Sequence, residues 1–305
     1  MTVPTGTRET YGAGVAGAAV GIREDLSNII YNISPEDTPF MSGIGKSSCD
    51  NTLFEWQIDK LSDAVPNTLV EGDVATVIPV VEMDRVSNFT QISGKTIQTS
   101  GTAEAVDFAG RKSTHAYQVA KRAKELKLDM EKMLLSTESG AVGSSGTARK
   151  TKCVGAWITS TTQVGSGGME DDIRATMSAC WDAGAKPDIL MVNGVLKQAI
   201  SAMAQTVSPL QTTANAASAA HVVAAVDIYV SDFGNLKMVP NRLMPASTGY
   251  FFDYDFWDIA YLRPFMTHDL ARTGDSESQQ LVVEYGLRSK NEAANASVTA
   301  WSADA

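Results

Sequence analysis

The sequence is poor in residues that form covalent or metal-bound frameworks. Its 305 residues include three cysteines, Cys49, Cys153 and Cys180, and their wide spacing fits neither a disulfide scaffold nor a zinc knuckle. Such sparse cysteine usage is typical of a reducing compartment. No apolar run approaches the roughly 20 residues that cross a bilayer. The weakly apolar residues 11–22 are interrupted by glycines and lack a positive flank, so we expect a flexible arm there and no signal peptide. From the cysteine spacing and the short apolar runs, we expect no bound metal and no membrane segment.

Motifs of catalysis are missing as well. The sequence has no Gly-x-Ser-x-Gly elbow, no His-Glu-x-x-His, no paired Cys-x-x-Cys and no EF-hand loop. The glycines at 165, 167 and 168 resemble a phosphate loop, but no lysine follows, and the acidic residues at 170–172 suit the start of a helix instead. We therefore expect no enzyme and no cofactor. One enzymatic alternative stays open, an α+β enzyme with a site at residues 165–195 that needs Asp171 or Asp188.

Positive charge is in deficit over the whole chain. There are 25 lysines and arginines against 35 aspartates and glutamates, a net charge of −10 and a pI near 4.8. This balance argues against unassisted, nonspecific binding to phosphate backbones or anionic lipid. Residues 111–132 are a local exception, with seven basic and three acidic residues. We interpret this segment, which includes Lys121, Arg122 and Lys124, as a solvated helix face or as a positive face that meets the acidic surface of a neighbouring copy.

The length exceeds what a single core usually holds, which predicts two lobes. The clearest element is a helix at about 114–135, because apolar residues recur at spacings of four and three along one face. The stripe consists of Val119, Ala123, Leu126, Met130 and Met133. Opposite it, Lys121–Glu125 and Lys127–Glu131 form i,i+4 pairs that we place on the solvated side.

The remaining pattern predicts the α+β class. Residues 165–205 indicate a helix, a short buried strand at 188–192 and a second helix, and Phe233-Gly234-Asn235 marks a hairpin. Further strands are expected near 249–254, 258–263 and 280–288. Asp253 and Asp255 would share one face of a strand, where solubilising acids are favoured over a calcium site.

The N-terminal third is a succession of extended pieces. Pro35 and Pro39 bracket one extended segment, and FEWQID places Phe54 and Trp56 on alternate positions of a strand. Residues 62–79 have the composition of a loop tip. The return stretch from Val86 to Thr102 has no consistently apolar face, and such a strand suits the surface of another molecule.

These residues resemble a known family. The runs NIIYNISPEDTPFMSGIGK at 28–46, FEWQIDKL at 54–61, EGD at 71–73 and EYGLRSKNEAANA at 284–296 are similar to major capsid proteins of tailed bacteriophages, which adopt the Hong Kong 97-type fold. The resemblance covers about the first third and last tenth of the chain closely. It implies an N-terminal arm at 1–50, an extended hairpin loop at 51–105 that lies over an adjacent subunit, a peripheral domain at 106–165 and 251–305 with spine helix 114–135, and an axial domain at 166–250.

The resemblance also implies a function and partners. Copies would assemble through pentamers and hexamers into the icosahedral head of a virion, made in the bacterial cytoplasm, that encloses double-stranded DNA without sequence-specific binding. A separate scaffolding protein, a portal and decoration proteins are the implied partners. The second alternative to a major capsid protein is a minor shell protein or a decoration protein of the virion. The candidate interface residues are Pro35, Pro39, Phe40, Phe54, Trp56, Glu71, Asp73, Lys95, Lys121, Arg122 and Lys124.

Some relatives by fold join a hairpin lysine to an asparagine of a neighbour. Lys95 and Asn291 or Asn295 are of the right types for this cross-link, but no feature of the sequence indicates the chemistry.

Overall fold

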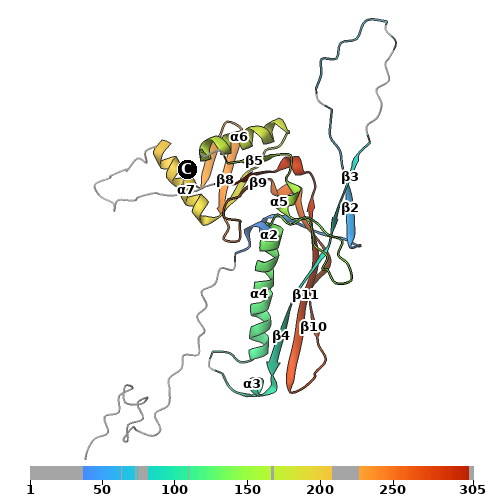
Figure 1. Cartoon of the computed structure of the whole chain (residues 1–305), viewed down its shortest axis with the longest axis vertical. Coiled ribbons are helices and arrows are strands. Elements are labelled where there is room, and N and C mark those ends of the chain that lie inside the picture. Colours follow the sequence, from blue (N-terminus) through green and yellow to red (C-terminus); the bar gives the residue numbers. More distant parts are fainter. Residues whose placement is uncertain are drawn as a thin grey trace, which may run out of the picture.

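The computed structural model describes residues 37–62, 64–72, 74, 82–108, 110–165, 168–207 and 227–301. The expectations for the arm before Asp37, including Pro35, and for Asp73 lie outside these residues. Figure 1 shows two lobes with a long loop leaving them.

The first lobe is a four-stranded sheet covered by one long helix. The strand order is β1 (Gly45–Ser48), β10 (Trp257–Asp269), β11 (Ser276–Ser289) and β4 (Gln91–Ser100). Helix α4 (Thr114–Leu134) lies along β4 and β11. It begins where the hydroxyl of Ser113 accepts the Ala116 N–H, a typical N-cap. The helix predicted at 114–135 is therefore confirmed, and its stripe buries Leu126 and Met130 against β11.

The second lobe is a six-stranded sheet with helices on one face. The order is β5 (Thr162–Val164), β12 (Ala296–Thr299), β9 (Gly249–Phe252), β6 (Ile189–Val192), β8 (Gly234–Pro240) and β7 (Ile228–Ser231). Helices α6 (Met169–Asp182) and α7 (Gly194–Val207) contribute their apolar stripes to the core on that face. The hairpin predicted at 233–235 is the β7–β8 turn.

Strand β6 explains why the two lobes form one body. Leu190 and Val192 belong to the core beneath α6 and α7, while Ile189 and Met191 belong to the core shared with α4. Because successive side chains point to opposite faces, an uninterrupted apolar run is what a strand covered on both sides requires.

Short elements complete the body. The stem of the long loop is a separate two-stranded sheet of β2 (Leu53–Ile58) and β3 (Asp84–Phe89). The remaining helices are α2 (Pro39–Gly43), α3 (Gly101–Ala105), α5 (Val154–Trp157) and the 3-10 turns η1 (Tyr254–Phe256) and η2 (Glu292–Ala294).

Three expectations from the sequence are wrong. The return stretch does have a buried face, because β4 pairs with β11 of its own chain and buries Ile97 under α4. Asp253 and Asp255 do not share a strand face, since Asp253 caps η1. The C-terminal segment does not stay with the first sheet, because β12 crosses into the second sheet between β5 and β9.

Candidate functional site: the extended loop and its anchors

The chain between β2 and β3 leaves the body as a long loop, at the end of the molecule opposite α3 (Figure 1). Its described apolar side chains are uncovered: Leu61, Leu69 and Val74 are 90%, 88% and 86% exposed. Glu71, one of the predicted interface residues, is also exposed. These apolar side chains are left in water in the single chain and are therefore available to another protein.

The stem that carries this loop is fixed by aromatic residues. Phe54 is 6% exposed and stacks on Trp56 at 5.7 Å between ring centroids, and Trp56 contacts Trp157 at 5.5 Å. The guanidinium of Arg288 lies 5.8 Å from the Phe54 ring. Phe54 and Trp56 therefore contact their own body, and these contacts fix the stem from which the loop leaves.

A buried asparagine ties the other strand of the stem to the body. Asn88 Nδ2 donates to Thr151 Oγ1 at 3.0 Å and to the carbonyl of Leu287, and Asn88 Oδ1 accepts the Lys152 N–H at 2.8 Å. The side chain thus bonds to two segments far from it in sequence. Since a buried amide without its partners is costly, these bonds hold β3 in one orientation.

Gly286 makes room for the stem. A Cβ placed there would lie 2.5 Å from Phe54 Cε1 and 3.1 Å from the Phe89 carbonyl oxygen. We expect Gly286→Ala to lower the free energy of unfolding by about 1–3 kcal/mol, the usual cost of overfilling a core, measured by urea denaturation. Adding Phe54→Leu should recover part of the loss in a double-mutant cycle, because the smaller side chain frees the space. Additive losses would contradict the proposed contact.

A second anchor joins the start of the described chain to α4. Glu131 is fully buried, and its two carboxylate oxygens accept the N–H groups of Phe40 and Met41, each at 2.8 Å. Asn241 is the residue after β8, and its Nδ2 donates to the same carboxylate at 2.8 Å. Burial raises the pKa of Glu131, and the three donors oppose that rise. One side chain thus links α2, α4 and the second lobe.

This anchor corrects two expectations. Glu131 does not pair with Lys127 on the solvated side, because it faces inward beside Leu134 and Leu135. Phe40 is fully buried in its own chain, 4.9 Å from the Phe252 ring, while Pro39 opens α2 at its first turn.

The charged candidates on and beside α4 are engaged to different degrees. Lys95 Nζ lies 2.7 Å from Asp129 and 3.5 Å from Glu125, which raises the pKa of this lysine. Arg122 pairs with Glu125 at 2.6 Å. Lys121 and Lys124 lie exposed on the outer face. Of the two asparagines considered for a cross-link with Lys95, Asn295 is buried and accepts from Trp257 Nε1, and Asn291 Oδ1 accepts the Ala293 N–H.

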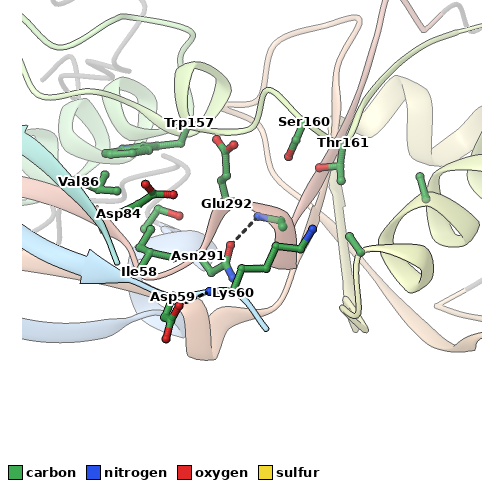
Figure 2. Close-up of a pocket in the computed structure, with 14 residues that line it drawn as sticks. Ile58, Asp59, Lys60, Asp84, Val86, Trp157, Ser160, Thr161, Asn291 and Glu292 are labelled. Atoms are coloured by element: carbon green, nitrogen blue, oxygen red, sulfur yellow. Dashed lines mark hydrogen bonds between the residues drawn. The ribbon is translucent and has the colours of Figure 1, made fainter. Parts of the chain in front are cut away.

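A groove of about 630 Å³ lies at the foot of the stem, and Figure 2 shows its walls. Ile58 and Val86 of the stem lie on the same side of it as Trp157 (Figure 2), and Ala179 of α6 and Ala183, the residue that follows α6, also line it. Asp171 and Asp188, the residues of the enzymatic alternative, do not line it. Asp171 instead pairs with Arg174 at 3.2 Å.

The described part of the chain holds no cluster of three or more metal-ligating side chains, and none of its helices is long and apolar enough to cross a membrane. The three cysteines are free and buried, and burial raises the pKa of Cys153 to about 11.

Sequence reasoning missed the residues that position the loop. Asn88, Glu131 and Asn241 gave no motif, since each acts on partners more than 60 residues away. The one available signal was Glu131 itself, an acid next to Met130 and close to Leu134 on the helix.

Comparisons with known proteins point to capsid proteins of phages. A family model described as SU10 major capsid protein matches residues 3–302. The major capsid protein of Escherichia phage Phieco32 is 29% identical over an alignment of 330 positions, and the alignment covers 89% of this chain and 92% of that protein.

Solved structures show the fold. The capsid of a native GTA particle has a TM-score of 0.61 at 13% identity, covering 92% of this chain and 96% of that one. The structure of phage G gp27 major capsid proteins and gp26 decoration proteins has a TM-score of 0.60 at 11% identity, with the same coverage. The chain therefore has the Hong Kong 97-type fold.

Proposed function

This chain belongs to the SU10 major capsid protein family, and from that membership we propose that its copies assemble through pentamers and hexamers into the icosahedral head of a tailed phage. Rings form when one surface of a subunit binds a different surface of the next and the rotation closes. The head would enclose double-stranded DNA without reading its sequence. We place its assembly in the cytoplasm of the host bacterium.

The observation that carries this proposal is the exposed loop on a fixed stem. Leu61, Leu69 and Val74 are uncovered in the single chain, although Phe54, Trp56 and Asn88 hold the stem firmly. A loop aimed in advance loses less conformational entropy on binding than a free one. We propose that it lies over the adjacent subunit, and that Glu71 and Asp73 contact that neighbour.

The boundaries of the implied domains are adjusted in this proposal. The intersubunit loop is the stretch 59–83 between β2 and β3, and β4 is assigned to the peripheral domain because it pairs with β11. Residues 37–50 are assigned to the body, since α2 contacts Glu131 and β1 pairs with β10.

Other virion components are proposed as partners. The phage G structure includes decoration proteins, and the procapsid of satellite phage P4 includes a size determination protein. By analogy we propose a scaffolding protein, a portal and decoration proteins for this chain.

Assembly is tested on the purified full-length protein by sedimentation velocity and negative-stain electron microscopy. We expect pentamers, hexamers or closed shells, because each subunit is tied to several neighbours and modest contacts multiply. A monodisperse monomer at every concentration and salt condition would argue against the proposal. A component present in few copies per particle would instead be a minor shell protein.

A further inference from the structure

The outer face of α4 carries a concentration of lysines on an otherwise acidic chain. Its exposed members are Lys121, Lys124, Lys127 and Lys132. Lysines 121, 124 and 132 are separated by three and eight positions, and therefore project from one side of the helix. Lys127, three positions after Lys124, lies at the edge of that side, and we call these four residues the lysine face.

The acids of the same helix are engaged away from Lys121, Lys127 and Lys132. Glu125 is paired with Arg122 at 2.6 Å, and Asp129 is paired with Lys95 of β4 at 2.7 Å. Glu131 is buried at the anchor of α2. Within the described residues, no ion pair joins Lys121, Lys127 or Lys132 to an acid of this chain.

The lysine face lacks the features of a protein-binding surface. Among the described residues, every large apolar side chain that is exposed lies outside α4, in contrast to the loop with its uncovered Leu61 and Leu69. Lysine is depleted from the buried parts of protein interfaces. The partner that suits this surface is therefore anionic, hydrated and not held by apolar contacts.

We propose that the lysine face contacts phosphates of the duplex DNA enclosed by the shell, an inference that rests on the proposed function. Lys121 and Lys132 are eleven positions apart, which is about 16 Å along a helix. That length crosses a DNA groove of about 12 Å, so lysines at both ends can reach phosphates on either side. Flexible ammonium groups neutralise phosphates without reading bases. The net charge of −10 keeps the contact weak and local.

The test compares two variants with the same change in charge. One replaces three lysines of the face, Lys121→Gln, Lys127→Gln and Lys132→Gln. The control replaces three exposed lysines on other elements, Lys46→Gln, Lys186→Gln and Lys237→Gln. Binding of unassembled full-length protein to a short fluorescent duplex is followed by anisotropy from about 0.01 M ionic strength upward, where screening is weak. The slope of log K against log salt is about −0.9 per neutralised phosphate.

We expect the slope of the helix variant to shrink by about two to three units, while the control keeps that of the wild type. Both variants should still form shells by electron microscopy. The inference is overturned if the wild type does not bind the duplex, or if the salt slope falls equally in both variants. It is also overturned if the helix variant alone fails to assemble, since the lysine face would then bind another subunit. Absence of shells from the wild type would instead reject the proposed function.

Discussion

Removal of the extended loop is expected to abolish assembly while the subunit remains folded. In the variant, residues 59–83 are replaced by Asn-Gly, which joins the paired residues Ile58 and Asp84 through a two-residue hairpin turn. The described part of this loop is exposed and the stem keeps its own anchors in Phe54 and Trp56, so the body loses almost no buried surface. The expected result is a monomer with unchanged urea midpoint that forms no rings or shells, as seen by sedimentation and electron microscopy.

A point variant separates loop length from loop chemistry. Leu61→Ser, Leu69→Ser and Val74→Ser keep the full length but remove the three most exposed apolar side chains of the part of the loop that the structure describes. If these side chains are covered by a neighbour, assembly should need a protein concentration at least about tenfold higher, since each buried leucine contributes about 1.5–3 kcal/mol. Shells formed by the shortened variant at the wild-type yield would show that subunits associate through other surfaces.

Loss of the Glu131 carboxylate should destabilise the subunit more than any other change on α4. Glu131→Ala leaves the N–H groups of Phe40 and Met41 and the amide of Asn241 without their acceptor in a buried site. Each unsatisfied buried donor costs about 1–3 kcal/mol, so we expect a loss of about 3 kcal/mol or more in the free energy of unfolding. Urea denaturation of the unassembled protein measures it, and limited proteolysis near α2 should become faster.

Glu125→Ala is the matched control on the same helix. Glu125 is partly exposed and pairs with Arg122 and Lys95, so its removal should cost less than about 1 kcal/mol. Equal losses for the two variants would contradict the anchoring role of Glu131.

The pH dependence of stability gives an independent test of this anchor. Burial holds the pKa of Glu131 in the folded protein above its ordinary value of 4.5. Its contribution to stability is therefore fully present below pH 4.5 and is lost as the pH rises through the folded-state pKa. Glu131→Gln cannot titrate, so the difference in stability between wild type and this variant should narrow as the pH rises from 4.5 towards neutrality. A difference that widens over this range would mean that the three hydrogen bonds lower the pKa of Glu131 by more than burial raises it.

The candidate site was predictable from sequence only in its general form. The loop composition at 62–79 and the alternation of Phe54 and Trp56 indicated an extended hairpin, because these signals lie within a few residues of each other. The end of that hairpin was misplaced, since β4 has the polar composition of a surface strand and becomes part of the body only through its pairing with β11. The residues that fix the stem could not be predicted from the sequence, because their partners are distant: Asn88 bonds to Leu287, 199 residues away.

The sequence by itself determined the elements whose cause is local: the helix with its apolar stripe, the uninterrupted apolar strand β6, the turn between β7 and β8, and the acidic first turn of α6. Tertiary structure alone decided which strands share a sheet and what a buried polar group bonds to. The carboxylate of Glu131 meets Phe40 across 91 positions, and the indole of Trp301 donates to Asp172 across 129. Periodicity reports which face of an element is apolar, but the partner of that face depends on how distant segments come together in space, and no short stretch of sequence encodes this.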